Sequence, residues 1–432
     1  MRSVAVGRKE SRQPSCTAQK GFRAGPRRTR GTAGPFRGEE RSALQVIYPV
    51  PEGATLHRAR FRQIFQTSHA LAQAGCEVDL LIGRNRTDLF GEVLPAYGLE
   101  QHPNLRIHTL PMLRREEGGF PGISWSGVFL LASLVKVRSL RRRGAVPFLF
   151  TRHLKPAAFF LRFRRTLRIP VVFEAHEIFH LTTDRKGRAE KIKREESRIY
   201  PRLDGIVSIT RGLAERMREA FNLRVPMAVV PDGVDPASFR TPGGSRKDRR
   251  ILYVGQLYPW KGAGTLIEAM AYVSSGELHL VGGSGERIQI LREKAAALGV
   301  LDRVVFHGQV TPRDVRRYLA EASVAVLPLS QDLISAHFTS PLKLFEYMAA
   351  GVPIVASDLP STREILSPGE NALLVPPEDP RALAGGIGKL LAHPSFAESL
   401  AKKALEDVQE YTWAKRAENI IRFLRSLKET AP

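Results

Sequence analysis

Apolar runs of strand length alternate with stretches of helical periodicity from Ala43 onward, and the alternation occurs twice. Such a pattern predicts parallel sheets with helices on both faces, because consecutive parallel strands need a crossover between them. The chain is therefore expected to be an α/β protein with two doubly wound, Rossmann-like domains. The expected strands are 43–50, 78–82, 106–110, 147–151, 171–174 and 206–209, then 251–254, 278–281, 304–306, 324–327, 354–356 and 373–375.

The two series are separated by a segment dense in turn residues, 231–250, which predicts a linker. The first domain is expected at 43–230 and the second at 251–410, followed by a terminal helix at 411–432. The stretch 396–427 as a whole has a helical pattern. Residues 1–42 are rich in Arg, Gly, Ser and Pro and show no apolar periodicity, so we expect a disordered basic tail.

The basic residues are unevenly distributed. The formal net charge is +23, of which residues 43–225 carry +14 and residues 226–432 only +1. This asymmetry predicts an anionic partner for the N-terminal half, either nucleic acid, an anionic membrane surface or a phosphorylated substrate.

Other features exclude several classes of protein. Two cysteines, Cys16 and Cys76, cannot build a disulfide framework or a cysteine-based zinc site. The longest nearly apolar run, 128–135, is too short to cross a bilayer, and no apolar segment of a secretory signal follows the basic N-terminus. We therefore expect a cytoplasmic protein. The sequence has no Asp-x-Asp pair at a strand end and no His/Cys cluster with ligand spacing, so we expect no metal or other cofactor.

The most informative motif is Thr339-Ser-Pro-Leu-Lys-Leu-Phe-Glu346. Ser340 is suited to cap a helix and Pro341 to occupy its first position. The free amides from Leu342 and Lys343 onward, with the lysine ammonium, would form an anion site. Lys343 and Glu346 share a helical face, which would suit the phosphates and ribose of a nucleotide, although an ordinary amphipathic helix can carry the same pair.

Two glycine-containing loops follow expected strands in the same half. The first contains Gly255 and Gln256 and leads to Lys261-Gly262, where a lysine could offset the charge of a diphosphate. The second is Val281-Gly-Gly-Ser-Gly285, with Gly283 at its centre. It could let the backbone approach a ligand, and a plain tight turn would explain it equally well.

Taken in order, these motifs resemble glycosyltransferase family 4. The resemblance includes the His-Gly-Gln-Val310 loop, the segment 350–355, the Pro231-Asp-Gly-Val-Asp235 turn and Tyr411-Thr-Trp413. It covers about 43–430 and implies a GT-B fold, retention of anomeric configuration, no metal requirement and a terminal helix that returns to the first domain. No convincing nucleophile is seen, so a same-face substitution with the leaving phosphate as base is expected by analogy.

The resemblance also implies roles for matching residues. Lys261 would stabilise the departing diphosphate, Glu346 would hold the ribose, and backbone amides of 340–343 would face the phosphates. The loop that contains Gln309 and Val310 would line the base pocket. Gln256 stands where the family usually has arginine, and Phe338 stands where it often has a glutamate that contacts the sugar. Asp332 or His337 could replace that glutamate.

On the acceptor side, three positions resemble cleft residues of the family: Gly53, His153 and His176. His153 is expected to take part in catalysis together with Lys261 and Glu346, and His176 to face the same cleft. The alternative for either histidine is an ordinary loop residue.

The sequence thus predicts a retaining glycosyltransferase that uses a nucleotide-sugar donor and a glycan or lipid-linked acceptor. The apolar and then basic segment 128–143, with further arginines at 162–168, suggests peripheral contact with the inner face of a membrane. A nucleotide-sugar epimerase of the same fold and a basic nucleic-acid-binding protein are the alternatives. The second is disfavoured because no aromatic-rich basic stretch is present.

Overall fold

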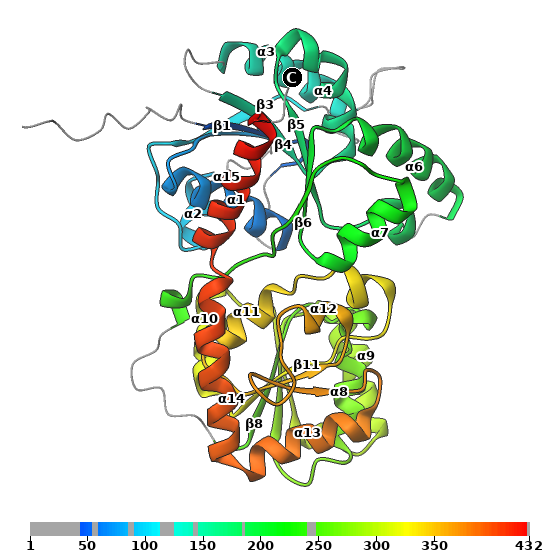
Figure 1. Cartoon of the computed structure of the whole chain (residues 1–432). Helices are drawn as coiled ribbons and strands as arrows, with labels where there is room; N and C mark the ends of the chain where they lie inside the picture. The colour runs from blue at the N-terminus through cyan, green and yellow to red at the C-terminus, as the bar shows by residue number, and fades with distance from the viewer. Residues whose placement is uncertain are drawn as a thin grey trace, which may run out of the picture. The chain divides into compact units, whose positions relative to one another are not determined.

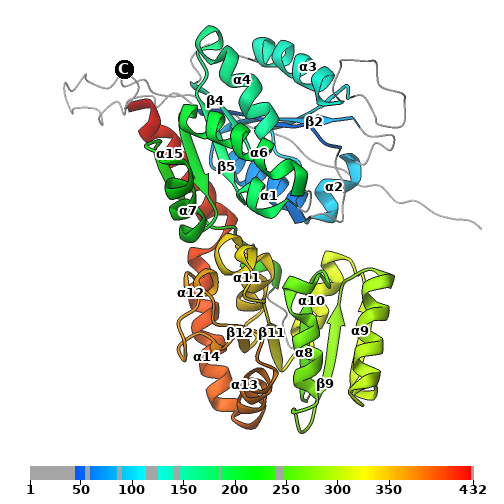
Figure 2. The same cartoon turned by 90° about the vertical axis from the view of Figure 1, so that its right-hand side faces the viewer.

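The structure is a computed structural model that describes residues 44–53, 59–84, 90–112, 125–140, 146–183, 186–239 and 248–429, all within one compact unit. It contains two sheets whose strands are all parallel, each covered by helices on both faces (Figures 1 and 2). The expected fold class is therefore confirmed.

The first sheet has seven strands in the order β3-β2-β1-β4-β5-β6-β7. The order reverses between β1 and β4, which is the topological switch point where ligands bind in doubly wound sheets. The strands are β1 (Leu44–Val50), β2 (Glu77–Gly83), β3 (Leu105–Leu110), β4 (Val146–Thr151), β5 (Val171–Ala175), β6 (Gly205–Ser208) and β7 (Met227–Val229).

Alternate side chains of the first sheet enter two separate apolar cores. In β1, Val46 and Tyr48 pack on one side and Ile47 packs on the other. The first side is covered by α1 (Ala59–Gln73), α2 (Phe90–Ala96) and α15 (Trp413–Glu429). The second side is covered by α3 (Trp125–Leu140), α4 (Leu154–Leu167), α6 (Lys186–Ile199) and α7 (Arg211–Phe221), with the short α5 (Phe179–Thr182) preceding α6.

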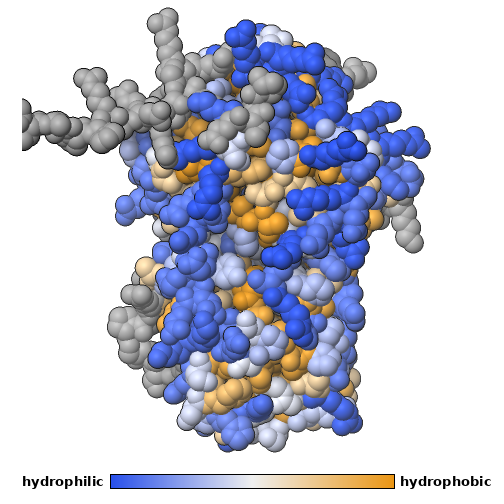
Figure 3. Space-filling model, in the orientation of Figure 1, coloured by the Kyte–Doolittle hydropathy of each residue, from blue (hydrophilic) through white to orange (hydrophobic). Residues whose placement is uncertain are grey.

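The second sheet has six strands in the order β10-β9-β8-β11-β12-β13, with its switch point between β8 and β11. Its strands are β8 (Arg250–Val254), β9 (Glu277–Val281), β10 (Val304–Gly308), β11 (Val324–Leu327), β12 (Ile354–Ser357) and β13 (Leu373–Val375). Its helices are α8 (Ala263–Met270), α9 (Gly285–Ala297), α10 (Pro312–Glu321), α11 (Leu342–Ala349), α12 (Pro360–Arg363), α13 (Pro380–Ala392) and α14 (Pro394–Asp407). On the face drawn in Figure 3, apolar residues (orange) are visible among hydrophilic residues (blue) in both the upper and the lower half of the molecule.

The C-terminal helical stretch is interrupted, contrary to the single run expected at 396–427. A short 3₁₀ turn (Val408–Glu410) follows α14, and α15 begins at Trp413 and packs beside α1 on the first sheet (Figure 1). The break exists because the backbone pairs with the linker there: the Val234 amide donates to the Tyr411 carbonyl at 2.9 Å. A Cβ atom on Gly233 would lie 2.6 Å from the Thr412 carbonyl carbon, so only glycine fits this approach. The two family-like segments at 231–235 and 411–413 are thus neighbours.

Twelve strands lie where the apolar runs predict them, to within a few residues at their ends. The thirteenth, β7, was missed because Met227–Val229 has only three residues and lies at the edge of its sheet. The basic tail expected at 1–42 lies outside the described residues.

Candidate functional site

A cavity of about 530 Å³ is lined by loops from the carboxyl ends of strands in both sheets. From the second sheet come the loops after β8, β9, β10 and β11 and the start of α11, and from the first come α1 and the loops after β4 and β5. Its size is typical of pockets for small molecules. The residues of the predicted donor site that line it are Gly255, Gln256, Lys261, Gln309, Val310, Ser340, Pro341, Leu342, Lys343 and Glu346.

Helix α11 begins one residue later than the motif predicts. Its N-cap is Pro341, not Ser340, and no side chain caps its first turn. The Ser340 hydroxyl instead accepts a hydrogen bond from the Asp232 amide at 3.1 Å, which draws the linker against the cavity wall. The first-turn amides of α11 are therefore left without a side-chain cap at the cavity, which is the arrangement that favours an anion.

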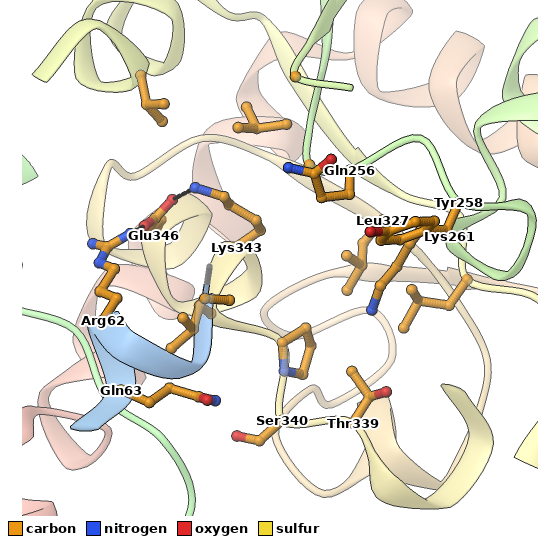
Figure 4. Close-up of a pocket in the computed structure, with 18 of the residues that line it drawn as sticks. Arg62, Gln63, Gln256, Tyr258, Lys261, Leu327, Thr339, Ser340, Lys343 and Glu346 are labelled. Carbon is orange, nitrogen blue, oxygen red and sulfur yellow. Dashed lines mark hydrogen bonds and ion pairs between the residues drawn. The ribbon is translucent and has the colours of Figure 1, made fainter. Parts of the chain in front are cut away.

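Glu346 is almost fully buried and lies between two cations. Its Oε2 atom is 2.7 Å from the Nζ atom of Lys343, as the spacing predicts, and its Oε1 atom accepts from Nη1 of Arg62 in α1 (Figure 4). Burial alone would raise the pKa of Glu346, but Lys343 and Arg62 together hold that pKa below its ordinary value. The carboxylate is therefore ionised, and its ion pair joins the two halves of the chain.

Lys261 ends a short 3₁₀ turn (Pro259–Lys261) in the loop after β8. Burial lowers the pKa of its ammonium below the ordinary value, and Asp332 opposes part of that shift. Burial likewise lowers the pKa of Lys343, against the effect of Glu346. Two poorly solvated ammonium groups in one cavity would be stabilised by an anionic ligand.

The opposite wall carries a second group of polar and ionisable residues. His176, which was predicted, lines the cavity together with Arg152, whose Nη1 donates to Oε1 of Gln63 at 3.0 Å. Burial and then Arg152 lower the pKa of His176, although Glu174, 3.4 Å from its Nε2, opposes them. His176 is therefore a neutral imidazole at neutral pH.

Two predicted residues of the acceptor side, His153 and Gly53, are not among the described residues that line the cavity. His153 is the N-cap of α4, and its Nδ1 lies 3.8 Å from Oε1 of Glu52. Burial, with Arg152 and Arg60 nearby, lowers its pKa to about 3, so it is neutral under ordinary conditions. It directly follows Arg152, which does line the cavity, but is not itself among the lining residues.

Gly283 also lies outside the cavity lining, whereas its neighbour Gly282 belongs to it. Both have positive φ angles, +120° for Gly282 and +87° for Gly283. A Cβ atom would meet the Gly255 carbonyl oxygen at 2.1 Å in the first case and the Leu257 side chain at 2.4 Å in the second. Packing against the loop after β8 is thus enough to require both glycines.

Phe338 lines the cavity where the sequence lacks the expected glutamate, at the end of a π-helical turn (Ile334–Phe338). Neither proposed replacement reaches the cavity lining. Asp332 accepts hydrogen bonds from the amides of Ile334 and Ser335 at 2.9 and 3.1 Å, and Nε2 of His337 pairs with Arg216 at 3.0 Å. Both side chains have structural partners instead.

Sequence reasoning did not single out Arg62, Gln63, Arg152, Tyr258 or Trp260, all of which line the cavity. Arg62 and Gln63 lie on the polar side of α1, where the pattern shows only a solvated face. Within the described ranges, no group of three or more His, Cys, Asp or Glu side chains is placed to hold a metal ion.

Two family models match the chain. One described as Glycosyltransferase Family 4 matches residues 61–238, and one described as Glycosyl transferases group 1 matches residues 248–393. Together they cover most of both sheet regions and most of the cavity lining.

Individual relatives show how far the similarity extends. A D-inositol 3-phosphate glycosyltransferase of Acidothermus cellulolyticus is 33% identical over 215 residues, which are 45% of this chain and 46% of the relative. A phosphatidyl-myo-inositol mannosyltransferase of Mycobacterium leprae is 31% identical over 202 residues, 45% of this chain and 52% of the relative. The chain thus spans about half the length of these curated relatives.

Solved structures resemble the chain over most of its length. A sucrose-phosphate synthase from Thermosynechococcus elongatus has a TM-score of 0.72 at 23% identity, covering 90% of this chain and 100% of that chain. The Anabaena protein HepE in complex with UDP has a TM-score of 0.68 at 16% identity, covering 89% of this chain and 100% of that chain. These similarities establish the fold.

Proposed function

Because the chain belongs to glycosyltransferase family 4, we propose that it transfers a sugar from a nucleotide-sugar donor to an acceptor hydroxyl with retention of anomeric configuration. One observation supports this most directly. Lys261, Lys343 and the uncapped start of α11 converge on one cavity, and the buried carboxylate of Glu346 lies one helical turn deeper. This arrangement suits a nucleoside diphosphate, with cations for its phosphates and a carboxylate for its ribose.

In the proposed reaction, the bond between the anomeric carbon and the diphosphate oxygen breaks and the acceptor oxygen bonds to the same face of that carbon. The acceptor proton passes to the departing phosphate oxygen. Negative charge develops on the diphosphate, so Lys261, Lys343 and the α11 dipole lower the barrier electrostatically. We propose that these groups neutralise the leaving group without a metal or other cofactor.

The role of His153 changes in this proposal. Since it is neutral and is not among the described residues that line the cavity, it would position the loop after β4 rather than touch the sugar. His176 and Arg152 would face the acceptor. An epimerase or a nucleic-acid-binding protein receives no support from the comparisons.

The function can be tested with a panel of UDP-, GDP-, ADP- and dTDP-sugars and the free diphosphates. A matching nucleotide at 100 times its Kd should stabilise the fold by about 2.7 kcal/mol, which a thermal shift detects. Sugar transfer should require an acceptor, unlike epimerisation, and should persist in EDTA. Absence of any shift across the panel would refute the proposal, and activity that EDTA abolishes and Mg²⁺ restores would refute its metal-free form.

We predict that Glu346→Ala and Glu346→Gln weaken binding of the matching nucleoside diphosphate about tenfold, as expected for loss of hydrogen bonds to a charged group. Inorganic pyrophosphate, which has no ribose, provides the control, and its affinity should not fall. Titration calorimetry measures both. If affinity for both ligands fell equally, Glu346 would act through Lys343 on the phosphates and the ribose role would be wrong.

For the acceptor, we propose an anionic or lipid-linked molecule bound at the N-terminal half, as the names of the two inositol-related relatives suggest. Helix α3 supports membrane contact because Leu131 and Val135 are 60% and 68% exposed and Arg138 is exposed on the same face. Arg162 and Arg165 are exposed on α4, and Arg168 is exposed at its C-cap. The basic run 141–143 lies outside the described residues, and no helix among those described is long and apolar enough to cross a membrane.

We expect the full chain to co-sediment with anionic vesicles at 0.1 M salt and to be released at 1 M, as the Debye length falls from about 10 to about 3 Å. Changing Leu131 and Val135 to serine should weaken attachment. The matched control changes Ile290 and Leu298, exposed apolar residues of the other half, to serine. Equal binding to neutral vesicles, or none to either kind, would refute membrane contact, and a variant lacking residues 1–42 shows whether that segment alone is responsible.

A further inference from the structure

Two large aromatic rings are exposed on the wall of the cavity. Tyr258 and Trp260 stack face to face with ring centroids 4.7 Å apart and an interplanar angle of 7°. They are 43% and 36% exposed, and both line the cavity. Single exposed aromatic residues are common, but a stacked pair open to a ligand pocket offers a flat apolar surface for a ring-shaped ligand.

The backbone between and after these rings is held firmly. The Trp260 carbonyl accepts three hydrogen bonds, from the amide and hydroxyl of Ser330 at 3.2 and 3.0 Å and from the Ser335 hydroxyl at 3.1 Å. Gly262 has a φ of +72°, and a Cβ atom there would lie 1.5 Å from the Pro328 carbonyl oxygen. These contacts hold the loop, and with it the two rings, in one conformation. The loop is ordered when the chain folds, so a ligand that binds the rings loses little further conformational entropy of the loop.

The position of the pair indicates which part of a nucleotide sugar would meet it. Trp260 directly precedes Lys261, the residue proposed to hold the diphosphate, and its anchors Ser330 and Ser335 follow β11. Strand β8 lies between β11 on one side and β9 and β10 on the other. The loop after β8, which carries the aromatic pair, therefore has the loop after β11 on one side and the proposed base loop at Gln309, after β10, on the other. Figure 4 shows Tyr258 beside Lys261, across the cavity from Arg62 and Glu346.

We propose that Tyr258 and Trp260 form a platform for the sugar of the nucleotide-sugar donor, an inference that rests on the proposed function. The transferred sugar is bonded directly to the diphosphate that Lys261 is proposed to hold. Trp260 is the preceding residue, and consecutive Cα atoms are only about 3.8 Å apart, so the platform lies close to the expected position of the sugar. The C–H groups of a pyranose form an apolar face with partial positive charge, and the face of an aromatic ring is partially negative. The Trp260 carbonyl is also hydrogen-bonded to Ser335, in the same π-helical turn that ends at Phe338, the lining residue that replaces the expected sugar-binding glutamate.

The test compares each nucleotide sugar that binds the wild-type chain with its free diphosphate in Trp260→Ala and Tyr258→Ala variants. Calorimetry should show affinity for the nucleotide sugar falling about three- to tenfold, the range for one aromatic contact, with affinity for the diphosphate unchanged. Trp260→Phe should retain most of the affinity. Tyr272→Ala is the matched control, since Tyr272 is 50% exposed, packs under Arg381 and lies outside the cavity lining.

The outcomes are distinguishable. Equal losses for nucleotide sugar and diphosphate would assign the rings to the base or phosphates and overturn the inference, as would unchanged affinity for both. An effect confined to the KM of the acceptor would assign them to the acceptor and overturn it as well. If no nucleotide or nucleotide sugar binds the wild-type chain, the proposed function fails and the inference fails with it. Thermal melting of each variant checks that it is folded.

Discussion

Replacing Lys261 with alanine should lower turnover about 10²–10³-fold, the effect of removing one electrostatic contact made to the developing charge of a transition state. The ammonium lies in a cavity that already disfavours its charge. Burial lowers the pKa of Lys261, and the negative charge of Asp332 offsets only part of that decrease. A departing diphosphate would supply the missing counter-charge. Its attraction is strongest as the sugar bond breaks, so kcat should fall more than KM rises.

The same variant should remain folded. The charged form of Lys261 is poorly stabilised before a ligand binds. Removing the Lys261 side chain should therefore lower the free energy of unfolding only slightly. Its neighbour Gly262 and the hydrogen bonds to the Trp260 carbonyl keep the loop in place. Thermal melting of the variant should therefore match that of the wild-type chain.

Lys294→Ala provides the matched control for activity. Lys294 belongs to α9 in the same half, is 37% exposed and pairs with Glu268 away from the cavity. Its removal should change kcat by no more than a few fold. Activity of Lys261→Ala close to that of this control would remove Lys261 from the mechanism.

The fold was predictable because buried parallel strands carry near-continuous apolar runs. Strands such as β1, β2 and β5 are buried along nearly their whole length, so their sequences contain few polar interruptions. Strand β7 gives no such signal, since it has three residues and none is fully buried. The interruption before α15 was also hidden, because its cause is a backbone pairing with Val234, far away in the sequence.

The candidate site was predictable mainly on its C-terminal wall, since His176 is the one predicted residue of the N-terminal half that lines the cavity among those described. Lys343 and Glu346 are three residues apart on a helix, so local spacing predicts their pairing. Arg62, the other partner of Glu346, is 284 residues away, and no local rule connects the two. The expected Ser340 cap was wrong for the same reason, because a distant amide, that of Asp232, takes its hydroxyl.

Arg416 is the residue whose loss should cost the fold most. It lies on α15 with a side chain 1% exposed, and its guanidinium donates to Thr67 Oγ1 at 3.1 Å, to the Val230 and Pro231 carbonyls at 2.5 and 2.7 Å, and to Glu174. It therefore joins the terminal helix, α1, the end of β5 and the start of the linker. Neither the resemblance nor the sequence pattern indicated this residue.

We predict that Arg416→Ala lowers the free energy of unfolding by about 3–5 kcal/mol, because it leaves the buried Glu174 carboxylate and two carbonyls without this partner. Arg422→Ala is the matched control on the same helix. Arg422 is exposed and donates a hydrogen bond to Oδ1 of Asn419 at 3.0 Å on its own helix, so its loss should cost no more than about 0.5 kcal/mol. Urea unfolding followed by circular dichroism measures both.

The pH dependence of that loss separates the ion pair from simple packing. Burial would raise the pKa of Glu174, but His176, Arg416 and Arg152 together hold it below the ordinary value of 4.5. A carboxylate with a depressed pKa contributes stability above its unfolded pKa and loses it as the pH falls through its folded pKa. The difference between the wild-type chain and Arg416→Ala should therefore be largest near pH 7 and shrink as the pH falls below 4.5. A difference that stays constant over this range would show that Arg416 stabilises the chain through packing alone.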